Sequence, residues 1–277
     1  MMAQTLANVT RSIRDLPSLP VVVMELLNLV DQDDVDISLL AKKVSRDLAL
    51  TAKTLQLANS PMFGTNIKVG TVQQAITLLG FAKVRTLITT AALSGCFPAR
   101  ICEGFDHTEF WRHSKETGIA ASVLARHMGL NTDHAFTAGL LHDIGRLVLV
   151  SSLPDDYAAA LAYRAEHGCS MLDAEQEIFR TDHAAVGELL AVSWNFSNEI
   201  RLAIGGHHQP DRPGVGFLAA IVHIANAIVH QLASSEAGDE IAPTVSAVAW
   251  KALNLNSAIY LQICEETQFN INHARSD

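Results

Sequence analysis

The feature that most constrains this chain is the pair His142 and Asp143, a histidine and a carboxylate side by side in an apolar run. Residues 138–141 (Ala-Gly-Leu-Leu) precede the pair and residues 147–150 (Leu-Val-Leu-Val) follow it, and we interpret the whole run as helical. A charged carboxylate is costly to bury unless a counter-charge or a metal ion pairs with it. The fold must therefore bring partners for Asp143 to this segment, and a divalent metal is one such partner.

Helical spacing dominates the rest of the sequence. Apolar residues recur at three- and four-residue steps, as Leu48, Ala52 and Leu55 do, and no segment shows the sustained alternation of a half-buried strand. The composition, 49% hydrophobic and only 6% aromatic, suits a core of aliphatic side chains and alanine. The sequence predicts an all-α fold. In the N-terminal half, helices are predicted at residues 16–30, after a cap at Asp36 or Ser38, at 47–59, from the cap Thr71 to Gly80, and from Ala82 onward. In the C-terminal half, one predicted helix ends at His127 and the next contains His142 and Asp143. Three more are predicted at 184–192, where Asp182 is the cap, at 198–206 and at 246–267.

A length of 277 residues accommodates one large domain or two small ones. Proline, glycine and charged residues interrupt the helical pattern at 98–106, so we expect a boundary there. Residues 1–100 are predicted to form an N-terminal helical subdomain, and residues 101–277 a second helical subdomain that carries the histidines and ends in a C-terminal helix. A polar break at 234–239 precedes that helix.

Charge and targeting signals exclude several classes of function. The formal net charge is -9, and an acidic surface repels the phosphate backbone of nucleic-acid polymers. The N-terminus lacks the apolar stretch of a signal peptide, and no run approaches the roughly 20 apolar residues needed to span a bilayer. The 4 cysteines form no C-x-x-C pair, which favours reduced thiols. We expect a cytoplasmic protein that associates with neither membranes nor nucleic-acid polymers, while its oligomeric state stays open.

Further histidines flank the central pair on different predicted helices. Of the 12 histidines in the chain, those that stand out beside His142 are His113, His183, His207 and His208. Imidazole and carboxylate ligands together suit iron, manganese, zinc or nickel, and the lack of a thiolate argues against a structural zinc site. A catalytic site of this kind activates water and polarises a phosphoryl oxygen, and the two oxygens of Asp143 would let it bridge two ions. The residues predict one or two divalent transition metal ions, iron or manganese before zinc or nickel.

These residues resemble the pattern of the HD-superfamily phosphohydrolases, in particular the HD-GYP branch, which hydrolyses cyclic di-GMP. The segment 142–146 (His-Asp-Ile-Gly-Arg) is similar to the central motif of that family. The segments 182–187 (Asp-His-Ala-Ala-Val-Gly) and 207–210 (His-His-Gln-Pro), with Trp194 between them, are more similar to the related HDOD domain. The chain lacks the Gly-Tyr-Pro segment of HD-GYP proteins.

The N-terminal half strengthens the resemblance to HDOD domains. Its segments 16–20, 47–51, 57–60 and 75–80 are similar to characteristic segments of that domain, and the likeness covers roughly residues 12–265. The resemblance implies a multi-helix bundle like that of the HD superfamily and a bacterial signalling role. Many HDOD members have lost the metal ligands and are regarded as non-catalytic signalling modules, whereas this chain keeps them.

The chain departs from the family pattern at the last expected ligand. HD-superfamily enzymes have an aspartate on a later helix, and the corresponding residue here is Asn226. A neutral amide oxygen is a weaker ligand than a carboxylate, so one metal position is weakened. His223 lies one turn away on the same helix face and is a candidate substitute ligand, although packing is the simpler role for it.

Two neighbours of these motifs have predicted roles of their own. Arg146 is either a catalytic residue that contacts a substrate phosphate or a surface arginine. Glu116, one turn beyond His113, either orients that histidine or adds a ligand.

The sequence leaves two functions open, ranks a purely structural helical scaffold without metal below both, and does not decide whether the protein is an enzyme. The first is a signalling protein of HDOD type, which acts through an unidentified partner protein or nucleotide and keeps its metal for structure or residual hydrolysis. The second is an active metal-dependent phosphohydrolase or phosphodiesterase on a cyclic dinucleotide or another phosphoester, with His142, Asp143 and Arg146 as catalytic residues. The predicted metal ligands are the same in both: His113, His142, Asp143, His183, His207, His208 and Asn226.

Overall fold

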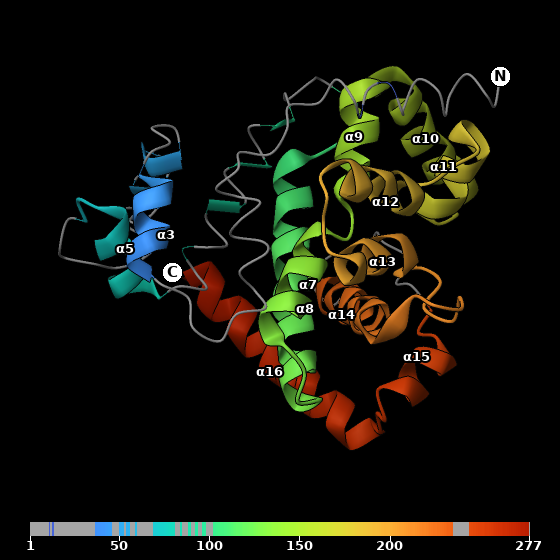
Figure 1. The fold of residues 1–277 in the computed structure, drawn as a ribbon. Coiled ribbons are helices and arrows are strands. Elements are labelled where there is room, and N and C mark those ends of the chain that lie inside the picture. Colours follow the sequence, from blue (N-terminus) through green and yellow to red (C-terminus); the bar gives the residue numbers. More distant parts are fainter. Residues whose placement is uncertain are drawn as a thin grey trace. The chain divides into compact units, whose positions relative to one another are not determined.

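The protein is all-helical in every part of the chain that the computed structural model describes (Figure 1). The described residues are 102–234 and 244–276 and, nearer the N-terminus, 37–45, 50–52, 54–55, 69–80 and a few isolated positions. No strand occurs among them, which confirms the all-α prediction. The helices are α3 (Ile37–Val44), α5 (Val72–Leu79), α7 (His107–His127), α8 (Thr132–Leu141), α9 (Ile144–Ser152), α10 (Pro154–His167), α11 (Met171–Phe179), α12 (His183–Ser193), α13 (Asn198–Gly206), α14 (Gly216–Ser234), α15 (Ala247–Ala252) and α16 (Ser257–Ser276).

The chain divides into two compact units, which we describe separately. One unit comprises residues 17–98 and 272–277, and the other comprises residues 1–16 and 99–271. The boundary that we expect at residue 100 stays a prediction, because residues 98–101 lie outside the described part of the chain.

In the first of these units, α5 begins and ends as the sequence predicts. The Thr71 hydroxyl accepts a hydrogen bond from the Gln74 amide, and Gly80 (φ +83°) ends the helix by donating its amide to Ile76 O. Ser38 lies inside α3, which packs against α5, so the prediction of Ser38 as a cap is wrong. The alternative cap at position 36 and the predicted helix at 16–30 lie outside the described residues.

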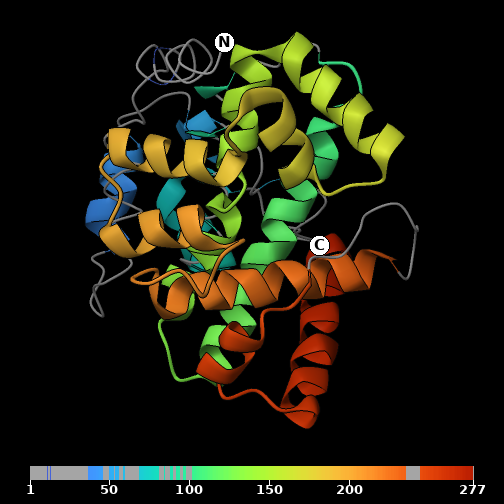
Figure 2. The same cartoon turned by 90° about the vertical axis from the view of Figure 1, so that its right-hand side faces the viewer.

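The second unit is arranged around the long helix α7. The Asp106 carboxylate begins this helix by accepting hydrogen bonds from the amides of Thr108 and Glu109. α8 lies along α7, and α14 packs against α7, α8 and α13 (Figure 2). α12 packs against α9 and α13, and α10 packs against α11. The helices predicted to end at His127 and to cover 184–192 and 198–206 are confirmed as α7, α12 and α13.

His142 and Asp143 lie at a break between two helices, so the prediction that they sit within one helix is wrong. His142 follows the last residue of α8, and Asp143 (φ -98°, ψ 11°) precedes the first residue of α9. An apolar run keeps the composition of a buried helix whether or not its backbone turns, which is why the pattern concealed the break. The turn places Asp143 at the beginning of α9, the helix that packs against α12.

Two glycines let the helices around this break approach closely. A Cβ atom on Gly145 would lie 2.0 Å from the carbonyl oxygen of His183, and one on Gly139 would lie 2.7 Å from that of Thr117. Neither distance is tolerable, so only glycine permits α9 to touch the first turn of α12, and α8 to touch α7, in this way. These contacts bring Asp143 within reach of His183.

α14 is the central apolar helix of the second unit. Its residues Ala220, Ile224 and Ile228 are buried in a cluster with aliphatic side chains of α7. Residues 216–233 are long and apolar enough to cross a membrane by length and composition, so the expectation that no run approaches this limit is wrong. However, 61% of this segment is buried inside the protein, as in the core helix of a folded domain.

The C-terminal region forms two helices where the sequence predicted one at 246–267. The Ser246 hydroxyl begins α15, and the chain turns at 253–256, where Asn254 has φ +48°. Asparagine adopts this left-handed conformation more readily than most residues, so it ends α15 before α16 begins.

Candidate metal centre

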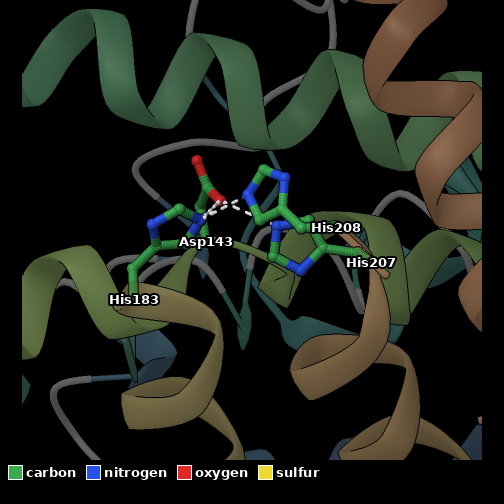
Figure 3. Close-up of side chains that lie close together, drawn as sticks. All are labelled: Asp143, His183, His207 and His208. Carbon is green, nitrogen blue, oxygen red and sulfur yellow. Dashed lines mark hydrogen bonds and ion pairs between the residues drawn. The ribbon is translucent and has the colours of Figure 1, made fainter. Parts of the chain in front are cut away.

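Asp143 lies at the centre of a cluster of histidines (Figure 3). Its Oδ1 atom is 3.1 Å from Nε2 of His183, 3.3 Å from Nε2 of His142 and 3.5 Å from Nε2 of His207. Only 5% of Asp143 is exposed. Burial alone would raise the pKa of this carboxyl group, but the imidazoles of His142 and His183 lower it well below its usual range. Asp143 is therefore an ionised group in the protein interior, and histidine nitrogens surround its Oδ1 atom.

His142 and His207 are oriented in the same way. Nδ1 of each ring lies 2.7 Å from a carbonyl oxygen three residues earlier, Gly139 O and Ile204 O respectively. Because a carbonyl can only accept, Nδ1 carries the proton and Nε2 keeps its lone pair. Both histidines are fully buried, and their Nε2 atoms make no hydrogen bond with any described residue. Histidines that bind metals are typically held through their second ring nitrogen in this manner.

His183 is held by a carboxylate. Its ring Nδ1 and its backbone amide both donate to Glu175 Oε2, at 2.6 and 2.8 Å. Asp182 caps the helix that His183 begins, as the sequence predicts. Burial lowers the pKa of the His183 imidazole, but the carboxylates of Glu175 and Asp143 outweigh burial and raise it to about 10. Two carboxylates thus make this position favourable for a positive charge.

His208 completes this set from the turn that follows α13. Its Nε2 lies 2.9 Å from Nε2 of His183, and its ring centroid lies 4.1 Å from that of His207. Burial lowers the pKa of His208 well below the usual value, and neighbouring histidines lower it further. Asp143, His183, His207 and His208 each offer one ligand atom within 4.8 Å of the others, and we call them the four-residue group.

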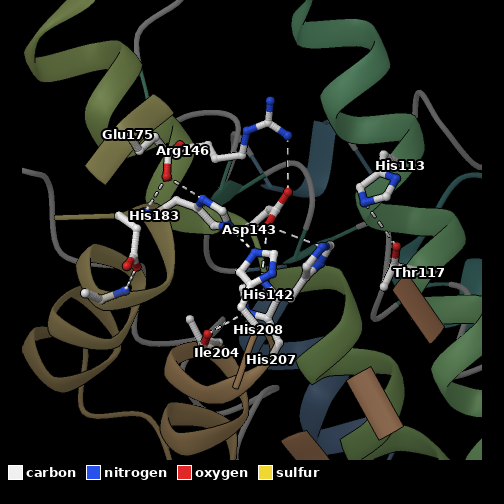
Figure 4. A network of polar contacts seen from close by, with 12 residues as sticks. His113, Thr117, His142, Asp143, Arg146, Glu175, His183, Ile204, His207 and His208 are labelled. Carbon is white, nitrogen blue, oxygen red and sulfur yellow. Dashed lines mark hydrogen bonds and ion pairs between the residues drawn. The ribbon is translucent and has the colours of Figure 1, made fainter. Parts of the chain in front are cut away.

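A second set shares Asp143 with the first. His113, His142 and Asp143 also offer ligand atoms within 4.8 Å of one another, and we call them the three-residue group. His113 projects from α7, with its ring centroid 5.3 Å from that of His142 and its Nε2 3.5 Å from the Thr117 hydroxyl (Figure 4). Asp143 therefore belongs to both groups, and its bridging of two ions stays a prediction.

Two candidate ligands on α14, Asn226 and His223, differ in whether their ligand atoms already make hydrogen bonds. Asn226 is 5% exposed, and its Oδ1 has no hydrogen-bond partner in the described part of the chain. That it binds a metal stays a prediction. His223 donates from Nδ1 to His207 O at 2.7 Å and accepts at Nε2 from the Ser246 amide at 2.9 Å. Backbone groups occupy both ring nitrogens, so the suggestion that His223 is a substitute ligand is wrong.

His230 lies beside the three-residue group and was not selected from the sequence. It follows Asn226 by one turn of α14, and its ring centroid is 4.8 Å from that of His113. The four-residue spacing from Asn226 was the signal that could have found it. On α7, Glu116 accepts a hydrogen bond from Arg112 at 2.6 Å, and its suggested role towards His113 stays a prediction.

Arg146 lies against Asp143, away from the histidines. Its Nη1 is 3.3 Å from Asp143 Oδ2, and its Nε donates to the Tyr157 hydroxyl at 2.9 Å. Its side chain is only 16% exposed, so the alternative of a surface arginine is wrong. Tyr157 and Glu175 are fully buried beside it. Neither residue was predicted from the sequence, because nothing in their helices distinguishes them from ordinary tyrosine and glutamate positions.

The donor set fits a divalent transition metal ion. Lone pairs of His142, His207 and His208 gather around one ionised carboxylate, and a buried cation would satisfy all of them. Imidazole nitrogen with carboxylate oxygen is the combination that iron, manganese, zinc and nickel accept. None of the four cysteines belongs to either group. These residues do not select one metal among the four.

An all-helical fold with a His-Asp pair and further histidines at neighbouring helix ends defines a domain of the HD type, the class that contains metal-dependent phosphohydrolases. The chain belongs to the HDOD domain family, whose model matches residues 16–210. The resemblance stated from the sequence is thereby confirmed. The match ends before α14, so Asn226 lies beyond it.

Relatives of known sequence share only part of their length with this chain. An uncharacterized protein of Treponema pallidum (strain Nichols) is 27% identical over 208 residues, which are 73% of this chain and 39% of that protein. Ribonuclease Y of Geobacter sulfurreducens is 30% identical over 118 residues, which are 43% of this chain and 17% of that protein. The match therefore spans less than half the length of either relative.

Solved structures resemble the chain over nearly its whole length. A "Putative phosphohydrolase" of Shewanella amazonensis SB2B is 28% identical, with a TM-score of 0.70 and 98% of both chains covered. An HDOD domain protein with unknown function from Geobacter sulfurreducens is 22% identical, with a TM-score of 0.74 and 98% of both chains covered. A "Putative signal transduction protein" of Marinobacter aquaeolei VT8 has a TM-score of 0.80 at 19% identity, covering 99% of this chain and 65% of that one. The last two support the fold alone.

Proposed function

We propose that this HDOD protein is a cytoplasmic, divalent-metal-dependent phosphohydrolase that acts on a small phosphoester. The observation that carries the proposal is the convergence of Nε2 atoms from His142, His183 and His207 on Asp143 Oδ1. Each ring is already fixed through Nδ1, as a metal ligand needs to be. Family membership adds support, because HDOD proteins are related to metal-dependent phosphohydrolases.

The proposed ligands are the residues of the two groups together with the amide of α14: His113, His142, Asp143, His183, His207, His208 and Asn226. One or two ions are proposed, iron or manganese before zinc or nickel. A divalent cation supplies Lewis acidity, which activates water and polarises a phosphoryl oxygen. The protein's own part is to hold the donors in place and to exclude bulk water, since Asp143, His142 and His207 are buried.

Arg146 is the proposed contact for the substrate phosphate. Tyr157 and Asp143 hold its guanidinium from two sides, and the ring of Phe105 lies 5.9 Å from its central carbon. Guanidinium donors match the geometry of phosphate oxygens, and an arginine that is already held loses little conformational freedom on binding.

A small phosphoester suits this protein better than a nucleic-acid polymer. The net charge of -9 opposes the approach of a long phosphate backbone. Ribonuclease Y acts on RNA by its name, but the match covers only 17% of that protein. The similarity therefore favours phosphodiester chemistry without indicating RNA, and a cyclic dinucleotide is the first substrate class to test.

A signalling module without turnover is the second candidate, and Asn226 favours it. A neutral amide at this position leaves the three-residue group with a single carboxylate, Asp143. In this case one ion in the four-residue group serves structure, and the protein acts through a partner protein or a bound nucleotide.

Elemental analysis of protein purified without air and without a metal-leaching resin tests the proposal. We expect one to two equivalents of iron or manganese, lost in His142→Ala and kept in His167→Ala, an exposed histidine of α10. The metal-loaded protein should hydrolyse bis(p-nitrophenyl) phosphate or a cyclic dinucleotide. Metal without any such hydrolysis would favour the signalling module. No metal after anaerobic reconstitution would contradict the metal site itself.

A further inference from the structure

Four buried polar side chains and the largely buried Arg146 form a closed ring of contacts along one side of the candidate metal centre. Figure 4 shows Asp143, Arg146, Glu175 and His183 of this ring. Asp143 Oδ2 lies 3.3 Å from Nη1 of Arg146, whose Nε lies 2.9 Å from the Tyr157 hydroxyl. That hydroxyl is 3.3 Å from Glu175 Oε1. Glu175 Oε2 is 2.6 Å from Nδ1 of His183, whose Nε2 returns to Asp143 Oδ1 at 3.1 Å. We call Tyr157 and Glu175 together the Tyr157–Glu175 bridge.

The direction of each hydrogen bond in the bridge follows from the chemistry of its groups. Arg146 can only donate, so the Tyr157 oxygen accepts and its own proton is left for Glu175. Burial raises the pKa of the Tyr157 hydroxyl, which therefore keeps that proton. Glu175 accepts from Tyr157, from the His183 ring and from the His183 amide. Every side-chain oxygen of the bridge thus takes part in a hydrogen bond, and the donor and acceptor of each bond cannot be exchanged.

The fold alone does not require this bridge. Tyr157 and Glu175 are both fully buried, on the packed helices α10 and α11, and buried polar groups of this kind can often be replaced by apolar side chains of similar volume without loss of stability. Burial of a carboxylate destabilises a protein unless positively charged groups pair with it. Here the positive groups are Arg146 on one side and the ring of His183 on the other. The bridge is therefore directed at the site.

We propose that Tyr157 and Glu175 are positioning residues that hold the metal ligand His183 and the phosphate contact Arg146 in register. Glu175 acts on the bound metal through His183, and Tyr157 acts on the substrate phosphate through Arg146. This inference rests on the proposed function, since it deepens the same site. The inference goes beyond the proposed function because it assigns separate effects to two residues that contact neither the metal nor the substrate.

Two conservative variants separate the two effects. Tyr157→Phe removes only a hydroxyl, so Mn²⁺ affinity, measured by chelator competition, should stay within about threefold of wild type. The affinity of the Mn²⁺-loaded protein for inorganic phosphate should fall about tenfold, as for one hydrogen bond to a charged group. Glu175→Gln keeps the shape but removes the charge, and Mn²⁺ affinity should fall about 10- to 100-fold.

Matched controls lie on the same two helices. Tyr163→Phe on α10 and Glu177→Gln on α11 change the same atoms outside the ring, where Tyr163 stacks on His167 and Glu177 pairs with Arg180. Neither control should alter Mn²⁺ or phosphate affinity by more than about twofold. A merely structural role would change the Mn²⁺ and phosphate affinities of Tyr157→Phe together, or would change neither. Either result, or an unchanged Mn²⁺ affinity in Glu175→Gln, would overturn the inference.

The metal-free protein separates a failure of this inference from a failure of the proposed function. The ring predicts slowly exchanging NMR signals for the Arg146 Nε–H and the His183 Nδ1–H groups. The Arg146 signal should exchange at least about tenfold faster in Tyr157→Phe and be unchanged in Tyr163→Phe. Protected signals in a wild-type protein that takes up no metal would sink the proposed function and still support the bridge. Unprotected signals in wild type would sink the bridge whatever the metal content.

Discussion

The four-residue group and the three-residue group share Asp143 but differ in the negative charge around them. In the four-residue group, Glu175 lies behind His183 and adds a second carboxylate to that of Asp143. Beside the three-residue group, α14 brings the imidazole of His230 next to His113, and the ligand that we propose from this helix is the neutral amide of Asn226. Since cation affinity depends on ligand charge as well as on ligand number, we expect the four-residue group to bind its ion more tightly.

Because of this difference, metal binding and catalysis can depend on different groups. An ion in the four-residue group satisfies the buried lone pairs of His207 and His208, and this alone would stabilise the fold. A second ion in the three-residue group would add the clamp on attacking and leaving oxygens that two-metal hydrolases use. Under the proposed function, we therefore expect phosphoester turnover to follow the metal affinity of the three-residue group.

Removal of Asp143 should have the largest effect, because it belongs to both groups. In Asp143→Asn the shape is kept but the charge is lost, and we expect metal content and phosphoester hydrolysis to fall to background together. Elemental analysis and an aryl phosphodiester assay measure this. Asp155→Asn, in the exposed first turn of α10, is the control and should keep both. One full equivalent of metal retained in Asp143→Asn would show that the carboxylate is not needed to hold the ion.

Gly145→Ala should break the four-residue group through the backbone. The new Cβ would lie 2.0 Å from His183 O, so α9 and α12 must separate. We expect a loss of about 1–3 kcal/mol in the free energy of unfolding, as for an overpacked core, and a larger loss of metal from the four-residue group than from the three-residue group. Urea unfolding and metal titration measure the two effects. Gly70→Ala, whose Cβ would meet only Gln74 Oε1 at 3.6 Å, is the control. Equal stability of the two variants would show that α9 and α12 can shift without cost.

The sequence predicted those parts of the molecule that depend on local patterns. The caps Thr71 and Asp182 were identified because a hydroxyl or carboxylate just before an apolar helical run accepts a hydrogen bond from an amide of the first turn. The set of histidines around Asp143 was identified because a buried charge demands partners, and the structure brings all of them together. Family resemblance supplied Asn226, which no local pattern would have indicated.

The parts that were missed depend on contacts between helices. The break at His142 and Asp143 is made possible by Gly145 against α12, a contact between segments about 40 residues apart in the sequence. Glu175 became visible only when α11 was placed beside the start of α12, since its own helix carries two other acidic residues, Asp173 and Glu177. The same holds for His223, whose backbone partners lie 16 and 23 residues away.

Asn226→Asp should sharpen the comparison by making the two groups more alike. A second carboxylate next to the three-residue group should raise the affinity for a second ion about tenfold, with little change in the first. Titration with Mn²⁺ under anaerobic conditions measures both affinities. Asn198→Asp, where Asn198 accepts from Arg201 at an exposed position of α13, is the control. An unchanged second affinity would remove Asn226 from the site, and the weakness of the three-residue group would then need another cause.

His223→Leu should have the smallest effect on metal and a clear effect on stability. The imidazole of His223 joins His207 O to the Ser246 amide, and it is directed at the backbone and not at the ligand atoms. Loss of both hydrogen bonds should lower the free energy of unfolding by about 1–3 kcal/mol, because two backbone groups lose their partner. Metal affinity should change by less than about threefold, since His207 remains fixed through its Nδ1 by Ile204 O. His134→Leu, at an α8 position that pairs with Glu199, controls for the loss of an imidazole elsewhere. A loss of metal in His223→Leu as large as that in His142→Ala would show that the turn after α13, and not the helix ends themselves, sets the position of the ligands.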